Sequence, residues 1–386
     1  MENNLSIAIV VIAYNRDRSL VRLLQSVNDA YVDAGTTLII SIDKSKNPKV
    51  EEEANSFNWA HGEKRVIAHR EKLGLRKHIL GCGKYLDEFD AIIVLEDDLV
   101  VSKNFYNYAI QTVAYYKDDE QIAGISLYQF LTNYQTFNPF YTQNSCYDTY
   151  FMRCAQSWGQ VWMKKQWKSF EKWYEINKDT GFDKTKMPES ICTWSSKSWL
   201  KYHTRYCIET SKYFVYPCVS LTSNSGECGT HLDFATPIFQ TNLQELEEDY
   251  RYRLAPFNSD SVRYDGLFEN EEIYNKLGIS ENDLCVRLNS KDAIDKNKRY
   301  VLTTASLPFR VINSFGLSLI PIELNVLNQV SGNLIFLYDT SIQDAKPKQN
   351  ARQIFAYYYR TDIFMTLRRL AGFGMKNIIM QILHKI

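Results

Sequence analysis

Strand-like and helix-like segments alternate through the first 130 residues, and this alternation is the feature that most restricts the possible folds. Short apolar runs predict strands at 6–16, 36–45, 64–70, 91–95 and 122–128. Amphipathic segments between them predict helices at 16–31, 48–60, 75–89 and 103–116. Such alternation is typical of a mostly parallel sheet with helices on both faces. We therefore expect an α/β fold.

The alternation ends after residue 140. Aromatic-rich segments predict helices at 157–175 and 191–212, and the next segment predicts a strand at 213–224. Residues 241–285 hold eleven acidic and four basic side chains, which is typical of a polar connector. We expect one α/β domain in two halves, then a connector and an extension, with boundaries at 1–130, 131–240, 241–300 and 301–386.

Composition excludes some functions. The chain has 386 residues and equal numbers of acidic and basic side chains, 45 of each, which argues against a general nucleic-acid binder. Its eight cysteines form no Cys-x-x-Cys pair, so a zinc site has no support. The N-terminal apolar run follows no basic segment and is interpreted as a strand rather than a signal peptide. We expect reduced thiols and a cytoplasmic location.

Three carboxylates, Glu96, Asp97 and Asp98, directly follow the apolar run at 91–95. Adjacent anions repel one another, so this arrangement costs stability unless a positive partner offsets it. A divalent cation takes carboxylate oxygens readily. Open α/β sheets bind ligands at the carboxyl ends of their strands, which favours a ligand site over a solvated acidic turn.

The "VIAYNR" turn that ends the first strand, together with "LEDDLVVSKNFYNY", resembles the GT-A glycosyltransferases. The nearest likenesses are the family 2 enzymes and the N-acetylglucosaminyltransferase I family. The resemblance covers about residues 5–235 and includes "SWGQVWMKKQW", which is similar to a Gly-Trp segment on the acceptor side. It implies a GT-A (Rossmann-like) sheet with a C-terminal extension, and an inverting, metal-dependent transferase.

The resemblance also implies roles for individual residues. Asp98 would bind Mn²⁺ or Mg²⁺, while Asp97 and Glu96 would bind the ribose, or the metal through water. A divalent ion would stabilise the charge on the departing diphosphate. Donor contacts are implied for residues at the ends of the first two strands: Ala13, Tyr14, Asn15, Arg16 and Asp43. Arg70 ends the third strand and Arg76 begins the next helix, and this placement puts both near a diphosphate at a helix N-terminus.

These donor residues also have ordinary explanations. Asn15 or Asp17 could cap the helix that follows the first strand. Asp43 could be a common turn residue. The basic residues at the end of the third strand and the start of the next helix (His69, Arg70, Arg76, Lys77 and His78) could form a solvated surface rather than a diphosphate site.

The Gly-rich segment "SNSGECGTH" at 223–231 could close over a nucleotide, and His231 could be a further metal or diphosphate ligand. A lone histidine is often structural, and that alternative stays open. Trp158 and Trp162 could stack on an acceptor sugar. Because they are spaced as i and i+4 on an expected helix, they could equally belong to the core.

The catalytic base is the weak point of the resemblance. Inverting transfer needs a carboxylate that deprotonates the acceptor hydroxyl. The resembling family has an Asp between two Trp residues, whereas "TWSSKSWLKY" at 193–202 contains no acid. Among nearby acids we rank Glu189 first and keep Glu227 as a second candidate, with Asp183 and Glu209 behind them.

The C-terminal tail predicts an amphipathic helix. From residue 352 it holds six Lys or Arg and one Asp, with Ile378, Ile379 and Ile382 on one apolar face. Such a helix can lie on an anionic membrane, here the inner face of the plasma membrane, or dock on the protein body.

The expected reaction moves a sugar, a hexose or an N-acetylhexosamine, from a nucleotide-sugar, best a UDP-sugar, to a saccharide or lipid-linked saccharide in surface polysaccharide synthesis. A sugar nucleotidyltransferase is a rival, although "AYNRDRS" lacks the glycines of its loop. An inactive sugar-binding module is the second rival, favoured by the missing acid.

Overall fold

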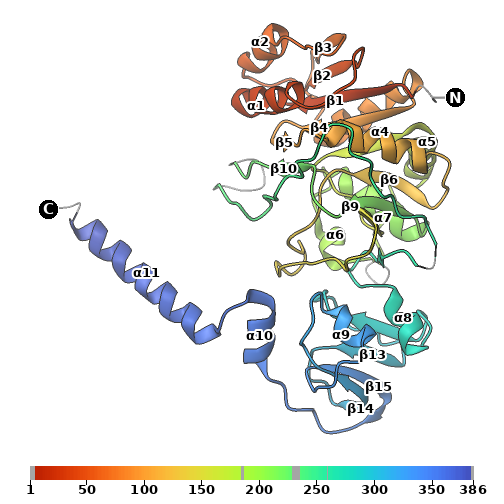
Figure 1. The fold of residues 1–386 in the computed structure, drawn as a ribbon, viewed down its shortest axis with the longest axis vertical. Coiled ribbons are helices and arrows are strands. Elements are labelled where there is room, and N and C mark those ends of the chain that lie inside the picture. Colours follow the sequence, from red (N-terminus) through yellow and green to blue (C-terminus); the bar gives the residue numbers. More distant parts are fainter. Residues whose placement is uncertain (1–4, 184–186, 228–234, 259, 384–386) are drawn as a thin grey trace. The chain divides into compact units, whose positions relative to one another are not determined.

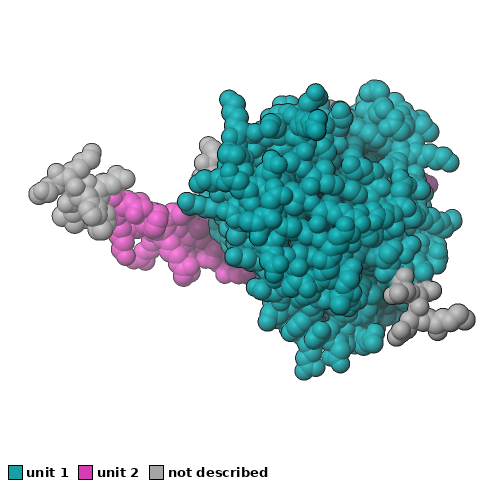
Figure 2. Space-filling view, turned by 90° about the horizontal axis from the view of Figure 1, so that it is seen from above, with its two compact units in different colours: residues 1–131, 144–271 teal, residues 132–143, 272–386 magenta. Residues whose placement is uncertain are grey.

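The computed structural model describes residues 5–183, 187–227, 235–258 and 260–383 (Figure 1). Two compact units form. The first contains residues 1–131 and 144–271, and the second contains residues 132–143 and 272–386 (Figure 2). The expected acidic connector at 241–300 falls on both sides of this division, with 241–271 in the first unit and 272–300 in the second.

A nine-stranded sheet forms the centre of the first unit, in the order β11-β7-β9-β6-β8-β4-β1-β2-β3. Five of its eight strand pairings are parallel and three are antiparallel. The α/β class with a mostly parallel sheet is therefore confirmed. The strands are β1 (Ile7–Ala13), β2 (Leu38–Ile42), β3 (Lys64–Ala68), β4 (Ala91–Glu96), β6 (Ile122–Ser126), β7 (Thr149–Met152), β8 (Gln160–Met163), β9 (Tyr213–Pro217) and β11 (Arg263–Tyr264).

Helices flank this sheet and bury their apolar sides against it (Figure 1). In α1 the buried residues Leu20, Leu23, Leu24 and Val27 recur at three- and four-residue spacing, as the sequence predicts. The helices of the first unit are α1 (Asp17–Asn28), α2 (Lys49–Ser56), α3 (Leu75–Gly81) with the 3-10 turn η1 (Cys82–Asp87), α4 (Phe105–Tyr116), α5 (Lys164–Asn177), α6 (Glu189–Thr193) and α7 (Leu200–Glu209).

The expected helix at 157–175 is wrong in its first part. Gln160–Met163 forms the buried strand β8, which pairs with β4 on one side and β6 on the other, and α5 begins only at Lys164. Hydrogen bonding to two neighbouring strands outweighs the helical spacing of the aromatic residues. Trp158 and Trp162 therefore do not share a helix face.

Two other expected elements are each divided. The helix expected at 191–212 forms α6 and α7, and the strand expected at 213–224 forms β9 and β10 (Thr222–Asn224). β10 pairs antiparallel with β5 (Leu99–Val101) in a separate two-stranded sheet. This pairing brings the segment after β10 to the acidic cluster that precedes β5.

The second unit has a four-stranded sheet of its own, in the order β12-β13-β15-β14. A second apolar core lies under α8 and α9. The elements are α8 (Glu272–Leu277), β12 (Leu284–Arg287), β13 (Tyr300–Thr303), β14 (Phe309–Phe315), α9 (Glu323–Leu327), β15 (Ile335–Gln343), α10 (Ala351–Tyr359) and α11 (Ile363–Leu383). Within the described residues, no helix is both long and apolar enough to cross a membrane.

The order of the first four parallel strands creates a switch point. The chain runs from β1 to β2 and β3 on one side, and then returns to β4 on the other side of β1. Ala13 ends β1, and Glu96 ends β4 opposite Ile12. Ligands of open α/β sheets bind at such points because the connections diverge there and leave space above the strand ends.

Candidate active site

The acidic cluster, Glu96, Asp97 and Asp98, lies at this switch point. Glu96 is the last residue of β4, and the two aspartates form the turn before β5. The side chain of Asp97 is 4% exposed and that of Asp98 is 19% exposed. The turn thus holds carboxylates partly out of water at the edge where a ligand would enter.

The turn after β1 closes over this cluster. The backbone N–H of Tyr14 donates to Oδ2 of Asp97 at 3.2 Å. The guanidinium of Arg16 bonds Oδ1 of Asp97 and donates to Oδ2 of Asp98 at 3.2 Å. Asn15 is exposed, and its carbonyl accepts a bond from Asn47. The structure therefore brings "AYNR" and the acidic cluster together.

The capping explanation of this turn is not supported. The N-cap of α1 is Arg16, and its side chain makes no cap bond. Asp17 instead accepts a bond from the Asn47 side chain at 2.9 Å.

Burial and mutual repulsion raise the pKa values of two of the three carboxylates. Burial, with the nearby Asp98 and Asp97, raises the pKa of Glu96 to about 8. Burial also raises the pKa of Asp97 to about 6, although the Arg16 guanidinium opposes the shift. One positive charge therefore does not fully offset three carboxylates, and a further cation would favour their ionised forms.

The cluster fits a divalent ion that is completed by its substrate. Oδ1 of Asp98 is buried and has no hydrogen-bond partner among the described residues. Mg²⁺ and similar ions often bind through one or two carboxylates plus substrate phosphates. Across the described ranges, no three His, Cys, Asp or Glu side chains form a protein-only metal site. The expected ligand His231 lies outside the described residues.

The carboxylate of Asp43 is bonded to the backbone that borders the site. It is 4% exposed, and its carboxylate accepts the backbone N–H of Leu73 at 2.7 Å and of Gly74 at 2.9 Å. Gly74 has φ +79°, a conformation that favours glycine, and it precedes α3. This clamp positions Lys72, whose ammonium donates to the Tyr14 hydroxyl at 2.8 Å.

The expected basic residues separate into different surroundings. Arg70 is exposed, whereas Arg76 donates to the Tyr202 hydroxyl on α7 at 3.0 Å and lies over its ring. His78 is buried, its Nε2 is 2.7 Å from Ser41 Oγ, and burial lowers its pKa to about 4. His69 is 3.3 Å from the same hydroxyl. His78 is therefore neutral at pH 7 and does not belong to a solvated basic surface.

Glu227 lies near the cluster but is already paired. Its carboxylate accepts bonds from Ser19 and Arg22 of α1. These bonds lower its pKa, which makes it a weaker proton acceptor. The N–H of Ser225 donates to the carbonyl of Asp98 at 2.8 Å, so this segment adjoins the metal candidate.

The other predicted base and acceptor residues have different surroundings. Glu189 is exposed as the first residue of α6, and Glu209 pairs with Arg205 at 2.8 Å. Trp158 is half-buried between Tyr128 and Phe239. Trp162 is 1% exposed and stacks on Trp167 at 3.7 Å between ring centroids. The faces of Trp162 are therefore not open to a sugar, which favours the core alternative.

Sequence analysis missed Ser19, Arg22 and Lys72. By sequence pattern, Ser19 and Arg22 are ordinary residues of an amphipathic helix, and Lys72 is an ordinary loop residue. Their roles come from partners more than 50 positions away, so no local pattern could have indicated them.

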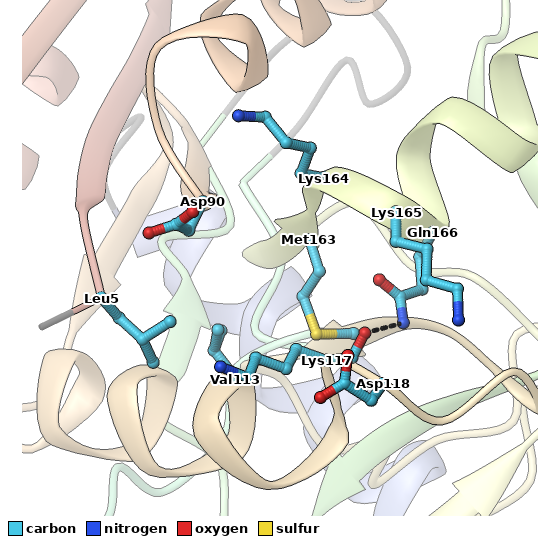
Figure 3. A pocket seen from close by; sticks show the side chains of 9 residues that line it. All are labelled: Leu5, Asp90, Val113, Lys117, Asp118, Met163, Lys164, Lys165 and Gln166. Carbon is cyan, nitrogen blue, oxygen red and sulfur yellow. Dashed lines mark hydrogen bonds between the residues drawn. The ribbon is translucent and has the colours of Figure 1, made fainter. Parts of the chain in front are cut away.

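A pocket of about 380 Å³ lies at the N-terminal ends of β1 and β4, at the other end of these strands from the acidic cluster (Figure 3). Leu5 precedes β1, Asp90 precedes β4, and Met163 ends the antiparallel strand β8. None of the predicted site residues lines it. The pocket is therefore separate from the acidic cluster.

No protein-family model matches this sequence, and no curated protein is similar to it. Among solved structures, the mannosyltransferase PcManGT from Pyrobaculum calidifontis, in complex with GDP-Man and Mn²⁺, is similar at TM-score 0.35 and 10% identity, over 56% of this chain and 58% of that chain. S. aureus TarS 1–349 in complex with UDP-GlcNAc is similar at TM-score 0.37 and 12% identity, over 56% and 58%. GalNAc-T7 with UDP, GalNAc and Mn²⁺ is similar at TM-score 0.37 and 11% identity, over 56% and 43%. The chain thus spans about half of each of these structures.

Proposed function

We propose that the first unit is a metal-dependent GT-A glycosyltransferase that uses a nucleotide-sugar donor. The observation that carries the proposal is the meeting of the "AYNR" turn and the acidic cluster at the switch point, where one buried Asp98 oxygen has no hydrogen-bond partner among the described residues. A sheet edge of this kind is where open α/β folds bind nucleotides. The motif resemblance favours a UDP-sugar.

The donor half of the mechanism follows from the residues at this edge. Asp98 would hold Mn²⁺ or Mg²⁺, with Asp97 and Glu96 binding the ribose or the metal through water. The ion would supply charge stabilisation for the departing diphosphate. Tyr14, with its hydroxyl held by Lys72, offers a ring that a base can stack on.

The wider donor site would use the rest of this rim. Ala13 and Asn15 border the space above β1, and Asp43 holds the backbone that leads to α3. Arg70 and Arg76 would offer positive charge to the diphosphate, as the exposed position of Arg70 allows. We retain His231 as a proposed further ligand.

Binding and hydrolysis of nucleotide-sugars test the proposal. A panel of UDP-, GDP- and dTDP-sugars is added to the full chain with Mn²⁺, with Mg²⁺ or with EDTA. We expect one nucleotide class to raise the melting temperature and to be hydrolysed slowly, in both cases only with metal. Absence of a response to every nucleotide would favour the rival sugar-binding module.

Glu189 is the proposed general base of an inverting reaction. Its side chain is exposed at the start of α6, where solutes can reach it. Glu227 ranks second because its bonds from Arg22 and Ser19 lower its pKa. We expect Glu189→Gln to lower sugar transfer by roughly 100-fold or more while donor binding stays unchanged. Transfer rate and donor Kd are measured together, with Glu171→Gln, which changes an exposed acid of α5, as the matched control. Equal transfer by both variants would rule out Glu189.

The proposed acceptor is a saccharide hydroxyl, and a lipid-linked saccharide would require membrane contact. On α11 the side chains of Phe364, Leu367, Leu370 and Phe373 are 55–66% exposed. Arg368, Arg369 and Lys376 lie along the same helix, and its residues include no acid. Exposed apolar side chains together with basic residues suit an anionic bilayer surface. Side chains beyond residue 377 lie outside the described part of this helix.

Vesicle binding tests this membrane contact. We expect the full chain to cosediment with vesicles that contain phosphatidylglycerol, and far less with pure phosphatidylcholine. Replacing Arg368, Arg369 and Lys376 by Gln should weaken this binding by roughly 100-fold, since each basic residue contributes about 1 kcal/mol. The matched control replaces three exposed lysines of α5, Lys165, Lys168 and Lys172. A similar loss in both triple variants would indicate net charge rather than this helix.

A further inference from the structure

The guanidinium of Arg16 lies between the carboxylates of Asp97 and Asp98, the second of which is the proposed metal ligand. It bonds Asp97 on one side and Asp98, at 3.2 Å, on the other. Among the described residues, Arg16 is the one cation that forms an ion pair with this cluster. It therefore occupies the electrostatic position that a divalent ion would take.

The location of Arg16 in the chain is otherwise unfavourable for a cation. Arg16 is the N-cap of α1, where the helix dipole presents its positive end. Its side chain makes no cap bond that would satisfy the helix N–H groups. The carboxylates of the cluster offset this cost, so the arginine and the acids stabilise one another in the absence of other ions.

We propose that Arg16 is an internal counter-ion that competes with the divalent ion for Asp98 and turns to the diphosphate when donor and metal bind. The inference rests on the proposed function and adds an order to its binding steps. A divalent ion at Asp98 would repel the guanidinium across a short distance. The nucleotide diphosphate provides a new anionic partner for Arg16 and the missing oxygen ligands for the ion.

This exchange makes metal and nucleotide binding cooperative. Without nucleotide, an ion at Oδ1 of Asp98 would repel Arg16 from Oδ2 of the same carboxylate and leave its charge poorly paired beside the helix N-terminus. With nucleotide, Arg16 keeps a partner, so the cost of displacing it falls. Linkage requires the effect to be reciprocal, so the metal must raise nucleotide affinity by the same factor.

Mn²⁺ binding measured by EPR tests the proposal without any turnover. The probes are Mn²⁺ alone, UDP alone and both together, on the wild-type full chain, Arg16→Gln and Arg18→Gln. Arg18 is an exposed arginine two residues along α1 and is the matched control. We expect UDP to tighten Mn²⁺ binding to the wild type by roughly 10-fold or more, within the usual range of such couplings.

Arg16→Gln should bind Mn²⁺ alone roughly 5-fold more tightly than the wild type, and UDP should then add little. Arg18→Gln should match the wild type. If Arg16→Gln loses this counter-charge and does not fold, Arg16→Lys replaces it. Its ammonium keeps the charge but lacks the fork that bonds both carboxylates, so Mn²⁺ alone should still bind more tightly than to the wild type. A melting curve identifies that case.

Two outcomes separate this inference from the proposed function. Unchanged Mn²⁺ affinity in Arg16→Gln, with normal UDP synergy, would overturn the counter-ion role and leave the transferase proposal intact. Tighter Mn²⁺ binding in Arg16→Gln, without any UDP effect in the wild type, would support the competition and overturn the nucleotide site. No Mn²⁺ binding by any variant would overturn both.

Discussion

Asp98→Asn is expected to abolish metal-dependent donor hydrolysis, with a loss of roughly 100-fold or more in rate. The carboxylate that is lost has a buried Oδ1 with no protein partner among the described residues. The amide that replaces it has one oxygen and no negative charge, so it binds a cation less well. The Mn²⁺-dependent rise in melting temperature with a UDP-sugar should disappear with it. Hydrolysis of the donor and thermal shift, each with and without EDTA, measure the two effects.

The variant itself should fold. Removing one charge from three adjacent carboxylates lowers their repulsion, and Oδ of the amide can still accept the bond from Arg16. Asp118→Asn is the matched control, because Asp118 is exposed and lines the pocket at the N-terminal ends of β1 and β4. Full metal-dependent activity in Asp98→Asn would remove Asp98 from the metal site and move the search to another ligand.

Trp162→Ala is expected to lower the free energy of unfolding by about 3–5 kcal/mol. The indole is 1% exposed, stacks on Trp167 and donates to Gln160 Oε1 at 2.6 Å. Its removal leaves a large cavity and an unpaired amide oxygen. The melting temperature should fall by roughly 10 °C, which a thermal unfolding curve measures.

Trp162→Phe is the companion variant, because it keeps an aromatic ring against Trp167 and should lose much less stability. Trp158→Ala should also cost less, since Trp158 is only half-buried. If Trp162 instead contacted the acceptor sugar, Trp162→Ala would change acceptor binding rather than stability. Near-normal stability of Trp162→Ala with a raised acceptor KM would show that the ring contacts sugar.

Local pattern was sufficient for the parallel half of the sheet. β1, β2 and β4 are continuous apolar runs that are buried almost throughout, and α1 between β1 and β2 buries residues at three- and four-residue spacing. Each of these strands is specified by its own residues, because a strand that is buried on both faces needs a continuous run of apolar residues. The same local pattern also predicted that the acidic cluster lies at the end of a strand.

Local pattern failed where pairing decides the structure. Gln160–Met163 belongs to a segment whose aromatic spacing suits a helix, yet it forms β8, whose backbone pairs with β4 on one side and β6 on the other. The burial of Trp162 follows from this placement. A pattern of single residues carries no information about which neighbours a segment will meet.

The sequence by itself determined that Glu96, Asp97 and Asp98 end a buried strand and that "AYNR" ends another. The tertiary structure alone decided that Arg16 bonds two of these acids across 81 and 82 positions, and that Glu227 is held by Arg22 across 205. The physical reason is that charge and hydrogen-bond partners depend on strand order. That order is set by the packing of the whole sheet and not by any segment of it.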